Sequence, residues 1–389
     1  MCHARDEVPM LPPADNPFTP TFGITPPLLV GREPELAAVR RALTRGPGDP
    51  ARAVFLTGPR GTGKTVLLNA LEDVAAEVGW AVLTETVQPG LADALTHTLL
   101  PQLLAAADGG SADAVVTGLN ATVLGVGAGV TRQVRERHPV EPTLRQQLEA
   151  LARRLADRGG GLFVSLDEVH RRDAAELRPL FHAVQHCFRQ GLPVAFAAAG
   201  LPSAVSGLLS DDVLTYLRRA ERFTLGPLPE TLVRAAIRQP IVQAGRAVAD
   251  EALDLAVDAV KGYAFLIQVV GFELWEADPT APAIGLAAAR VALPRVSRTA
   301  ARLVYEPALQ DISAHDRRFL RAMAADGLDP TPVAAIMNRL GATRSHLNKY
   351  RARLIAAQLI EPAGRGLLRF AIPFLREHLR AADSSADEV

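Results

Sequence analysis

One glycine-rich run constrains this chain more than any other part of its sequence: Gly58-Pro59-Arg60-Gly61-Thr62-Gly63-Lys64-Thr65. It follows an apolar stretch, 53–57, that is typical of a buried strand, and it precedes apolar residues that recur at helical spacing. Its glycines allow positive φ and let backbone N–H groups approach a phosphate closely at a helix N-terminus. The run therefore predicts a phosphate-binding loop, in which Lys64 contacts the β- and γ-phosphates and the Thr65 hydroxyl ligates Mg²⁺.

Glycine-rich turns between a strand and a helix also occur in proteins that bind no ligand. Lysine usage argues against that alternative, because the chain has 42 basic residues and its only other lysines are Lys261 and Lys349. A lysine at the one position where a phosphate-binding loop needs it is therefore not an effect of composition. We expect the chain to bind a nucleotide through this run.

Composition excludes several classes of protein. At 389 residues and 48% hydrophobic content, the chain is long enough for two or three domains with separate cores. Its 42 basic and 42 acidic residues cancel, so any nucleic-acid-binding surface has to be local. The cysteines, Cys2 and Cys187, are too few for a disulfide framework or a metal site. No apolar leader is present, and the apolar stretches 114–130 and 194–199 are interrupted or short, so we expect a cytoplasmic protein that does not contact the membrane.

The first half of the chain has the pattern of an α/β domain. Five apolar strands are expected, at 53–57, 80–85, 162–166, 194–199 and 222–225. Because they alternate with helical segments, they predict a parallel sheet that helices cover on both faces, in a domain at 28–226. The preceding residues, 1–27, are rich in proline and are expected to form an extended arm. The stretch 114–130 has no role that the sequence assigns.

The second half has a different pattern. Residues 227–295 are expected to form a helical lid. Three further helices and two strands predict a winged helix-turn-helix at 296–382, with the helices at 314–325, 332–340 and 343–357. The acidic tail, 383–389, is expected to be disordered.

Two carboxylates follow the third expected strand, Asp167 and Glu168. The carboxyl ends of neighbouring parallel strands meet at one edge of a sheet, so we expect this pair to converge with the phosphate-binding loop. Asp167 would then hold Mg²⁺ through water, and Glu168 would polarise an attacking water. Charges solvated in a loop are the alternative for a carboxylate pair considered alone. His170 completes the run Asp-Glu-Val-His, which is also found in helicases. A helicase would need a second recombinase-like domain, and the sequence does not predict one. A surface histidine is therefore the simpler interpretation of His170.

Two groups of basic residues are possible functional sites. Arg218, Arg219 and Arg222 precede or begin the fifth expected strand and could supply an arginine finger to a neighbouring subunit, Arg222 in particular; a solvated helix end is the alternative. The third helix of the expected winged helix carries basic residues, and others lie at and behind its wing: Arg344, His346, Lys349, Arg351, Arg353, Arg365 and Arg369. This distribution predicts a DNA-binding surface with phosphate contacts, and a module used only for packing is the alternative.

The chain resembles the AAA+/STAND superfamily, in particular its archaeal-type and origin-recognition-like ATPases. The resemblance rests on five features together: the phosphate-binding loop, Asp167-Glu168, Val30-Gly31-Arg32-Glu33, the run 199–203 and the terminal winged helix. The resemblance implies an AAA+-type P-loop sheet with a lid, and it implies ATP rather than GTP. It also places Val30 and Arg32 beside the adenine pocket. The absence of an Asn-Lys-x-Asp sequence, which guanine-binding proteins carry, agrees with ATP.

The chain departs from the family pattern at two positions. The lid run Lys261-Gly262-Tyr263-Ala264-Phe265 has neither a sensor arginine nor the Gly-x-Pro of STAND lids, and the fourth expected strand ends at Ala199-Gly200 without a polar sensor. Both departures favour slow hydrolysis. We therefore expect a slow Mg²⁺-dependent ATPase that acts as a nucleotide-dependent switch and binds double-stranded DNA, with a homo-oligomer or a protein partner possible. An ATP-binding scaffold with little turnover and a protein partner on its winged helix is the alternative.

Overall fold

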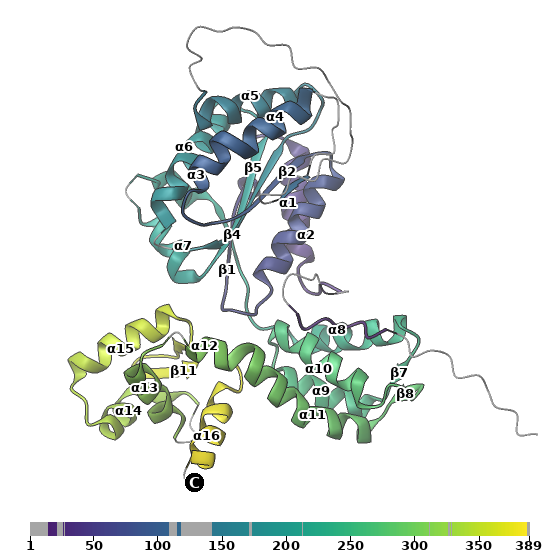
Figure 1. The fold of residues 1–389 in the computed structure, drawn as a ribbon, viewed down its shortest axis with the longest axis vertical. Helices are drawn as coiled ribbons and strands as arrows, with labels where there is room; N and C mark the ends of the chain where they lie inside the picture. Colours follow the sequence, from purple (N-terminus) through teal and green to yellow (C-terminus); the bar gives the residue numbers. More distant parts are fainter. Residues whose placement is uncertain are drawn as a thin grey trace, which may run out of the picture. The chain divides into compact units, whose positions relative to one another are not determined.

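A computed structural model describes residues 15–21, 26, 28–108, 115–117, 142–170, 173–211, 213–310, 312–325, 327 and 329–386. The chain forms two compact units (Figure 1). One consists of Gly31–Gly226, and the other combines residues up to Val30 with Pro227 onward.

The first unit is built on a six-stranded sheet with the strand order β3-β2-β4-β5-β1-β6, in which every pair is parallel. Its strands are β1 (Ala53–Thr57), β2 (Ala81–Thr86), β3 (Val115–Thr117), β4 (Leu162–Val169), β5 (Val194–Gly200) and β6 (Glu221–Thr224). The expected parallel α/β sheet is therefore confirmed. The edge strand β3 was not expected, and it accounts for 115–117, the part of the stretch 114–130 that lies within the described residues.

Helices cover both faces of this sheet. They are α1 (Glu33–Arg45), α2 (Lys64–Glu77), α3 (Leu91–Ala94), α4 (Leu100–Asp108), α5 (Leu144–Ala156), α6 (Ala174–Arg189) and α7 (Pro202–Leu209), with short turns at Pro50–Arg52, Leu95–Leu99 and Thr215–Arg219. Figure 1 shows α1 and α2 on one face and α3 to α6 on the other. Strand β5 is buried at every position because it has helices on both sides, which explains its uninterrupted apolar sequence. The rings of Phe55, Phe181 and Phe196 pack together at centroid distances of 5.1–6.3 Å.

The second unit begins with four helices, α8 (Glu230–Gln243), α9 (Asp250–Val260), α10 (Ala264–Ala277) and α11 (Leu286–Ala300), and a short parallel pair, β7 (Ala247–Val248) and β8 (Ala283–Ile284). Its carboxyl-terminal part contains a π-helical turn (Ala301–Tyr305), α12 (Glu306–Gln310), α13 (Ala314–Ala324), α14 (Val333–Leu340), α15 (Arg344–Ala356) and α16 (Leu375–Ala386). Strands β9 (Thr331–Pro332), β10 (Ile360–Pro362) and β11 (Leu367–Phe370) form an antiparallel sheet in the order β10-β11-β9. Helix α16 continues to Ala386, into the tail expected to be disordered, so that expectation is wrong for 383–386; residues 387–389 lie outside the described part of the chain.

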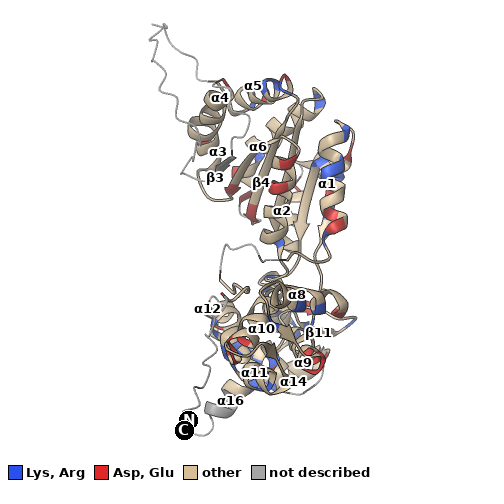
Figure 2. Ribbon diagram, turned by 90° about the vertical axis from the view of Figure 1, so that its right-hand side faces the viewer, with Lys and Arg blue, Asp and Glu red and all other residues tan. Residues whose placement is uncertain are grey.

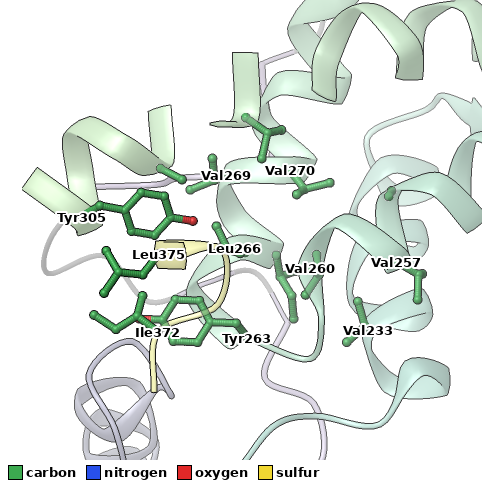
Figure 3. Close-up of a cluster of buried hydrophobic side chains, with 14 of the residues drawn as sticks. Val233, Val257, Val260, Tyr263, Leu266, Val269, Val270, Tyr305, Ile372 and Leu375 are labelled. Atoms are coloured by element: carbon green, nitrogen blue, oxygen red, sulfur yellow. The ribbon is translucent and has the colours of Figure 1, made fainter. Parts of the chain in front are cut away.

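The helices of the expected lid and the carboxyl-terminal part share one hydrophobic core. Tyr305, Ile372 and Leu375 lie against the side of α10 that carries Tyr263 and Leu266 (Figure 3). All of these side chains are at most 6% exposed. Burial of this apolar surface opposes separation of the two parts, so we expect them to move as one body.

The amino-terminal arm packs against helix α10 of the same unit. Phe18 is 1% exposed, and a Cβ placed on Gly271 would lie only 2.4 Å from its ring, so a glycine is required under the phenylalanine. Asn16 Nδ2 donates to Phe272 O (3.3 Å) and to Glu276 Oε1 (2.8 Å). Thr19 N donates to Gln268 Oε1 (3.1 Å). The extended segment 15–21 is therefore attached to α10 by both apolar and polar contacts.

Candidate nucleotide site

The glycine-rich run forms the loop between β1 and α2. Gly61 and Gly63 have φ of 72° and 87°, and Gly63 is the N-cap of α2. The Thr62 hydroxyl donates to Pro59 O (2.8 Å) and closes the loop on itself. These conformations direct backbone N–H groups toward the helix N-terminus, where the helix dipole favours an anion.

Lys64 lies over this loop, and its amine is largely buried. Nζ donates to Gly58 O and to Pro59 O, both at 2.9 Å. The pKa of Lys64 is lowered to about 8, chiefly by burial; the nearby Asp167 carboxylate opposes this shift, and the positive charge of Arg60 contributes to it. An ammonium group held by neutral carbonyls in a partly dry loop is poised to exchange them for a phosphate, whose charge would restore its pKa.

This pKa predicts proton uptake on nucleotide binding. With the free site at about 8 and the phosphate-bound site higher, the bound state holds more protons between the two values, so affinity falls as pH rises above 8. Calorimetric titration of Mg-ATP in two buffers of different ionisation enthalpy should give an uptake of about 0.1 proton at pH 7 and about 0.9 at pH 9. Equal, small uptake at both pH values would show that Lys64 does not change its charge on binding.

Asp167 connects the loop to strand β4. The Thr65 hydroxyl donates to Asp167 Oδ2 (2.7 Å), and the Glu168 backbone N–H donates to Asp167 Oδ1 (2.8 Å). The expectation that β1 and β4 are neighbours is wrong, because β5 lies between them. Helix α2 crosses back over β5 and contacts β4, so Thr65 still reaches the carboxylate.

Glu168 is presented by an irregularity in β4. The pairing of β4 with β5 is regular up to Leu166 and resumes at Val169, which is opposite Gly200. Glu168 itself has φ of 57°, a left-handed conformation that is rare for residues other than glycine. Its side chain is exposed and one residue beyond Asp167, where a carboxylate can contact a water beside the terminal phosphate.

The connector between the units, Leu225–Leu228, contacts the phosphate-binding loop at one end and the lid helices at the other. In the first unit Leu225 N donates to Thr57 O (2.7 Å), and Leu225 O lies 2.6 Å from the position of a Cβ on Gly58. In the second unit Leu228 N donates to Gly262 O (2.8 Å), between α9 and α10. A shift of the loop around a phosphate would therefore act directly on the connector.

Substitution of Gly58 by alanine tests this close contact. The new Cβ would also lie 2.8 Å from Thr62 Oγ1, so the loop or the connector has to move. We expect a loss of about 1–3 kcal/mol in stability, or about 2–10 °C in the Tm of the first unit, and weaker nucleotide binding. Gly48→Ala is the matched control, because a Cβ there meets nothing within 4 Å. Equal Tm values for the two variants would contradict the contact.

The residues expected near adenine differ in their surroundings. Val30 packs on the core of the second unit, whereas Arg32 is the residue before α1 in the first. Arg32 is 9% exposed, and its Nη2 atom has no hydrogen-bond partner among the described residues. Burial lowers the pKa of Arg32, opposed by Glu35 and Glu33. A buried donor without a partner fits a ligand with acceptor atoms, such as a nucleotide.

The candidate arginine fingers are not brought to this loop. Arg218 Nε donates to Leu209 O (2.9 Å), which ties it to the end of α7. Arg219 precedes the amino end of β6, and Arg222 is exposed on this edge strand, opposite Phe55 of β1. A contribution to catalysis by Arg222 would have to be made to a second copy of the chain, as the sequence analysis assumed.

The basic residues of the second unit fall into two groups. The first group is exposed and forms no ion pair with described residues. It consists of Arg344, His346 and Lys349 on α15 and of Arg365 between β10 and β11. Arg351 is half-buried, with an unpartnered buried Nε.

Arg353 and Arg369 have acidic partners instead. Arg353 donates to both oxygens of Asp316 (2.7 Å each) and lies over the Tyr350 ring, and Arg369 lies 3.4 Å from Asp329. Arg353 is thus engaged in packing α15 against α13. Acidic and basic residues are both present along the ribbon of each unit (Figure 2), in agreement with a net charge of zero.

Sequence reasoning missed two residues at the site. The contact of Leu225 with Gly58 joins residues far apart in the chain and has no sequence signal. Glu72 of α2 lies close to β4, where the Ser165 hydroxyl donates to it. A signal for Glu72 did exist, because this charge occurs four residues after the buried Leu68 and three before the buried Ala75.

Three features define a P-loop nucleotide-binding fold: a strand, a glycine-rich loop with a half-buried lysine at the start of the next helix, and an aspartate that this helix contacts. Residues 28–196 match the family model described as an AAA ATPase domain. Residues 302–379 match a family described only as a domain of unknown function (DUF8462). No curated protein sequence matches the chain.

Solved structures agree with this assignment. The Walker-type ATPase PABY2304 of Pyrococcus abyssi is 17% identical, with a TM-score of 0.60 over 90% of this chain and 96% of that one. The Aeropyrum pernix ORC2 protein, in its ADPNP-ADP complexes, is 15% identical, with a TM-score of 0.56 over 94% of this chain and 98% of that one. The chain therefore shares the α/β P-loop fold of these two structures. Among the described residues, no helix is both long and apolar enough to cross a membrane.

Proposed function

We propose that this protein is a slow Mg²⁺-dependent ATPase that acts as a switch: the presence of a γ-phosphate changes how the second unit is oriented, and the second unit binds DNA. The observation that carries this proposal is the contact between Thr65 and Asp167, at 2.7 Å, beside the half-buried amine of Lys64. It joins the phosphate-binding loop and the carboxylate pair in one site.

The residues present fit a bound magnesium ion. Thr65 and Asp167 supply a hydroxyl and a carboxylate, the oxygen ligands that Mg²⁺ prefers alongside water and phosphate. Bound there, Mg²⁺ would offset negative charge on the β- and γ-phosphates. Lys64 would hold the same phosphates through its ammonium group, and Glu168 would accept a proton from the attacking water.

Slow turnover is proposed because some expected catalytic groups are missing from the described residues around the loop. Strand β5 ends in Ala199 and Gly200, both buried and apolar, where a polar side chain could otherwise contact the γ-phosphate. The turn before α10 has Lys261, which pairs with Asp258 of its own helix. Positive charge for the developing phosphate anion would then come from Lys64, or from Arg222 of another subunit.

The switch is supported by the two ends of the connector and by the shared core of the second unit. A ligand shifts a conformational equilibrium only if it contacts the two states differently. A γ-phosphate would do so by pulling Lys64 away from Gly58 O, next to Leu225. Because the lid helices and the carboxyl-terminal part share one core, movement at Leu228 would carry α15 with it.

DNA binding by a winged helix is proposed from the elements and charges of the carboxyl-terminal part. Helices α13, α14 and α15 with the β10-β11-β9 sheet have the order of a winged helix-turn-helix. The exposed Arg344 and Lys349 lie on α15, the helix that would enter the major groove, and Arg365 lies between the two strands of the wing.

A salt titration tests the DNA proposal. The logarithm of DNA affinity should fall with the logarithm of salt concentration, with a slope that decreases in magnitude by about 0.9 for each phosphate contact removed. We expect Lys349→Ala and Arg344→Ala to reduce both affinity and slope without changing Tm. Arg353→Ala should instead lower Tm, because Asp316, whose side chain is 6% exposed, loses its partner. Absence of DNA binding at low salt would favour the scaffold with a protein partner.

A further inference from the structure

We infer that Glu72 is a positioning residue for the magnesium site: by binding Ser165 it fixes helix α2 on strand β4, so that Thr65 and Asp167 are held in the geometry that a metal ion needs. This inference rests on the proposed nucleotide-dependent function. Glu72 does not itself contact either of the two proposed ligands.

The first observation is that α2 and β4 are joined by two polar contacts. The Thr65 hydroxyl donates to Asp167 Oδ2, and the Ser165 hydroxyl donates to Glu72 Oε1. Thr65 and Glu72 are seven residues apart, which is close to two helical turns, or about 10 Å along one face of the helix. Ser165 and Asp167 are two residues apart, so they lie on one face of the strand about 6–7 Å from each other.

The two contacts together prevent a movement of α2 relative to β4 that one contact alone would allow. With the Thr65 contact alone, α2 could rotate or slide about that point while its apolar residues remain buried. The second contact, two turns further along, removes this freedom. A metal ion that needs near-ideal octahedral geometry is sensitive to such small displacements of its ligands.

The Glu72 carboxyl group lies in a partly buried environment, where a hydroxyl group donates a hydrogen bond to it. Ser165 is completely buried, and Thr84 of β2 is its register partner, so two hydroxyl-bearing residues lie side by side on neighbouring strands. Burial raises the pKa of Glu72, and the hydroxyl of Ser165 opposes the shift. A partly buried carboxylate costs free energy unless hydrogen bonds compensate for its lost solvation, and the Ser165 hydroxyl supplies one here.

The test measures nucleotide binding with and without the metal. For wild type, Glu72→Gln, Glu72→Leu and Ser165→Ala, the affinity for a fluorescent ATP analogue is measured in EDTA and as a function of Mg²⁺ concentration. We expect Glu72→Leu and Ser165→Ala to lower the apparent Mg²⁺ affinity by about tenfold, the smallest effect seen when a group that orients metal ligands is removed, while affinity in EDTA stays within about twofold. Glu72→Gln keeps a hydrogen-bonding group and should resemble wild type.

Other outcomes overturn the inference. If affinity falls equally in EDTA and in Mg²⁺, Glu72 only maintains the fold of the loop. If neither changes although Tm confirms that the variants fold, the contact with Ser165 does not control the ligands. If wild type itself binds no nucleotide, the proposed function fails, and that result is distinguishable because it needs no variant. Ser165→Ala and Glu72→Gln keep the test valid should Glu72→Leu fail to fold.

Discussion

Lys64→Ala should abolish measurable ATP binding while leaving the protein folded. Hydrogen bonds to a charged group contribute about 1.5–3 kcal/mol each, and two phosphate contacts would be lost, so we expect Kd to rise by at least about 100-fold. The free protein should not be destabilised. Burial lowers the pKa of Lys64 to about 8, so the ammonium group that predominates at neutral pH costs free energy in the folded protein, and alanine is well tolerated at the start of a helix.

The control for Lys64→Ala is Lys349→Ala, which removes an exposed lysine of α15 in the other unit. It should leave ATP affinity unchanged. Equilibrium binding of a fluorescent ATP analogue, with thermal unfolding measured on the same samples, separates loss of binding from loss of fold. Unchanged affinity in folded Lys64→Ala would mean that the glycine-rich loop is not the nucleotide site.

The second large effect is expected from Glu168→Gln, which should stop turnover and preserve binding. General base catalysis contributes about 10²–10⁴-fold, so turnover should fall by at least about 100-fold. The glutamine has nearly the same shape, and the contact of residue 168 with Asp167 is made by its backbone N–H, so metal and nucleotide binding should remain. Phosphate release and ATP affinity are measured side by side.

Glu176→Gln, in the first turn of α6, is a matched control that changes a neighbouring carboxylate in the same way. Its turnover should equal that of wild type. If Glu168→Gln keeps more than about a tenth of wild-type turnover, another group takes the proton, because removal of a general base costs more than that. The half-buried His170, whose backbone N–H donates to Asp173 Oδ2 (3.2 Å), would then be the next residue to replace.

Local patterns predicted most of the α/β unit. The glycine-rich loop and the five strands depend on periodicity and on glycine positions within short windows, and each was found close to its expected bounds. Strand order depends on contacts between distant segments, which is why the insertion of β5 between β1 and β4 was not anticipated.

Long-range packing explains the remaining differences. The proline-rich arm was expected to be extended, but nothing in its sequence indicates that Phe18 packs over Gly271, because the space is created by a helix some 250 positions later. Similarly, the lid helices and α16 each have an ordinary amphipathic pattern, which does not reveal that Tyr305, Ile372 and Leu375 join them in one core.

The most direct test of the account is the distance between the two units in different nucleotide states. Labels at Arg158→Cys in the first unit and Arg298→Cys in the second allow single-molecule energy transfer, in protein in which Cys2 is replaced by serine and buried Cys187 is left in place. The account predicts different distance distributions with Mg-ADPNP and with Mg-ADP, and loss of the difference in Lys64→Ala. Identical distributions in both nucleotides, in protein that binds both, would contradict the switch, since a ligand that contacts two states equally shifts neither.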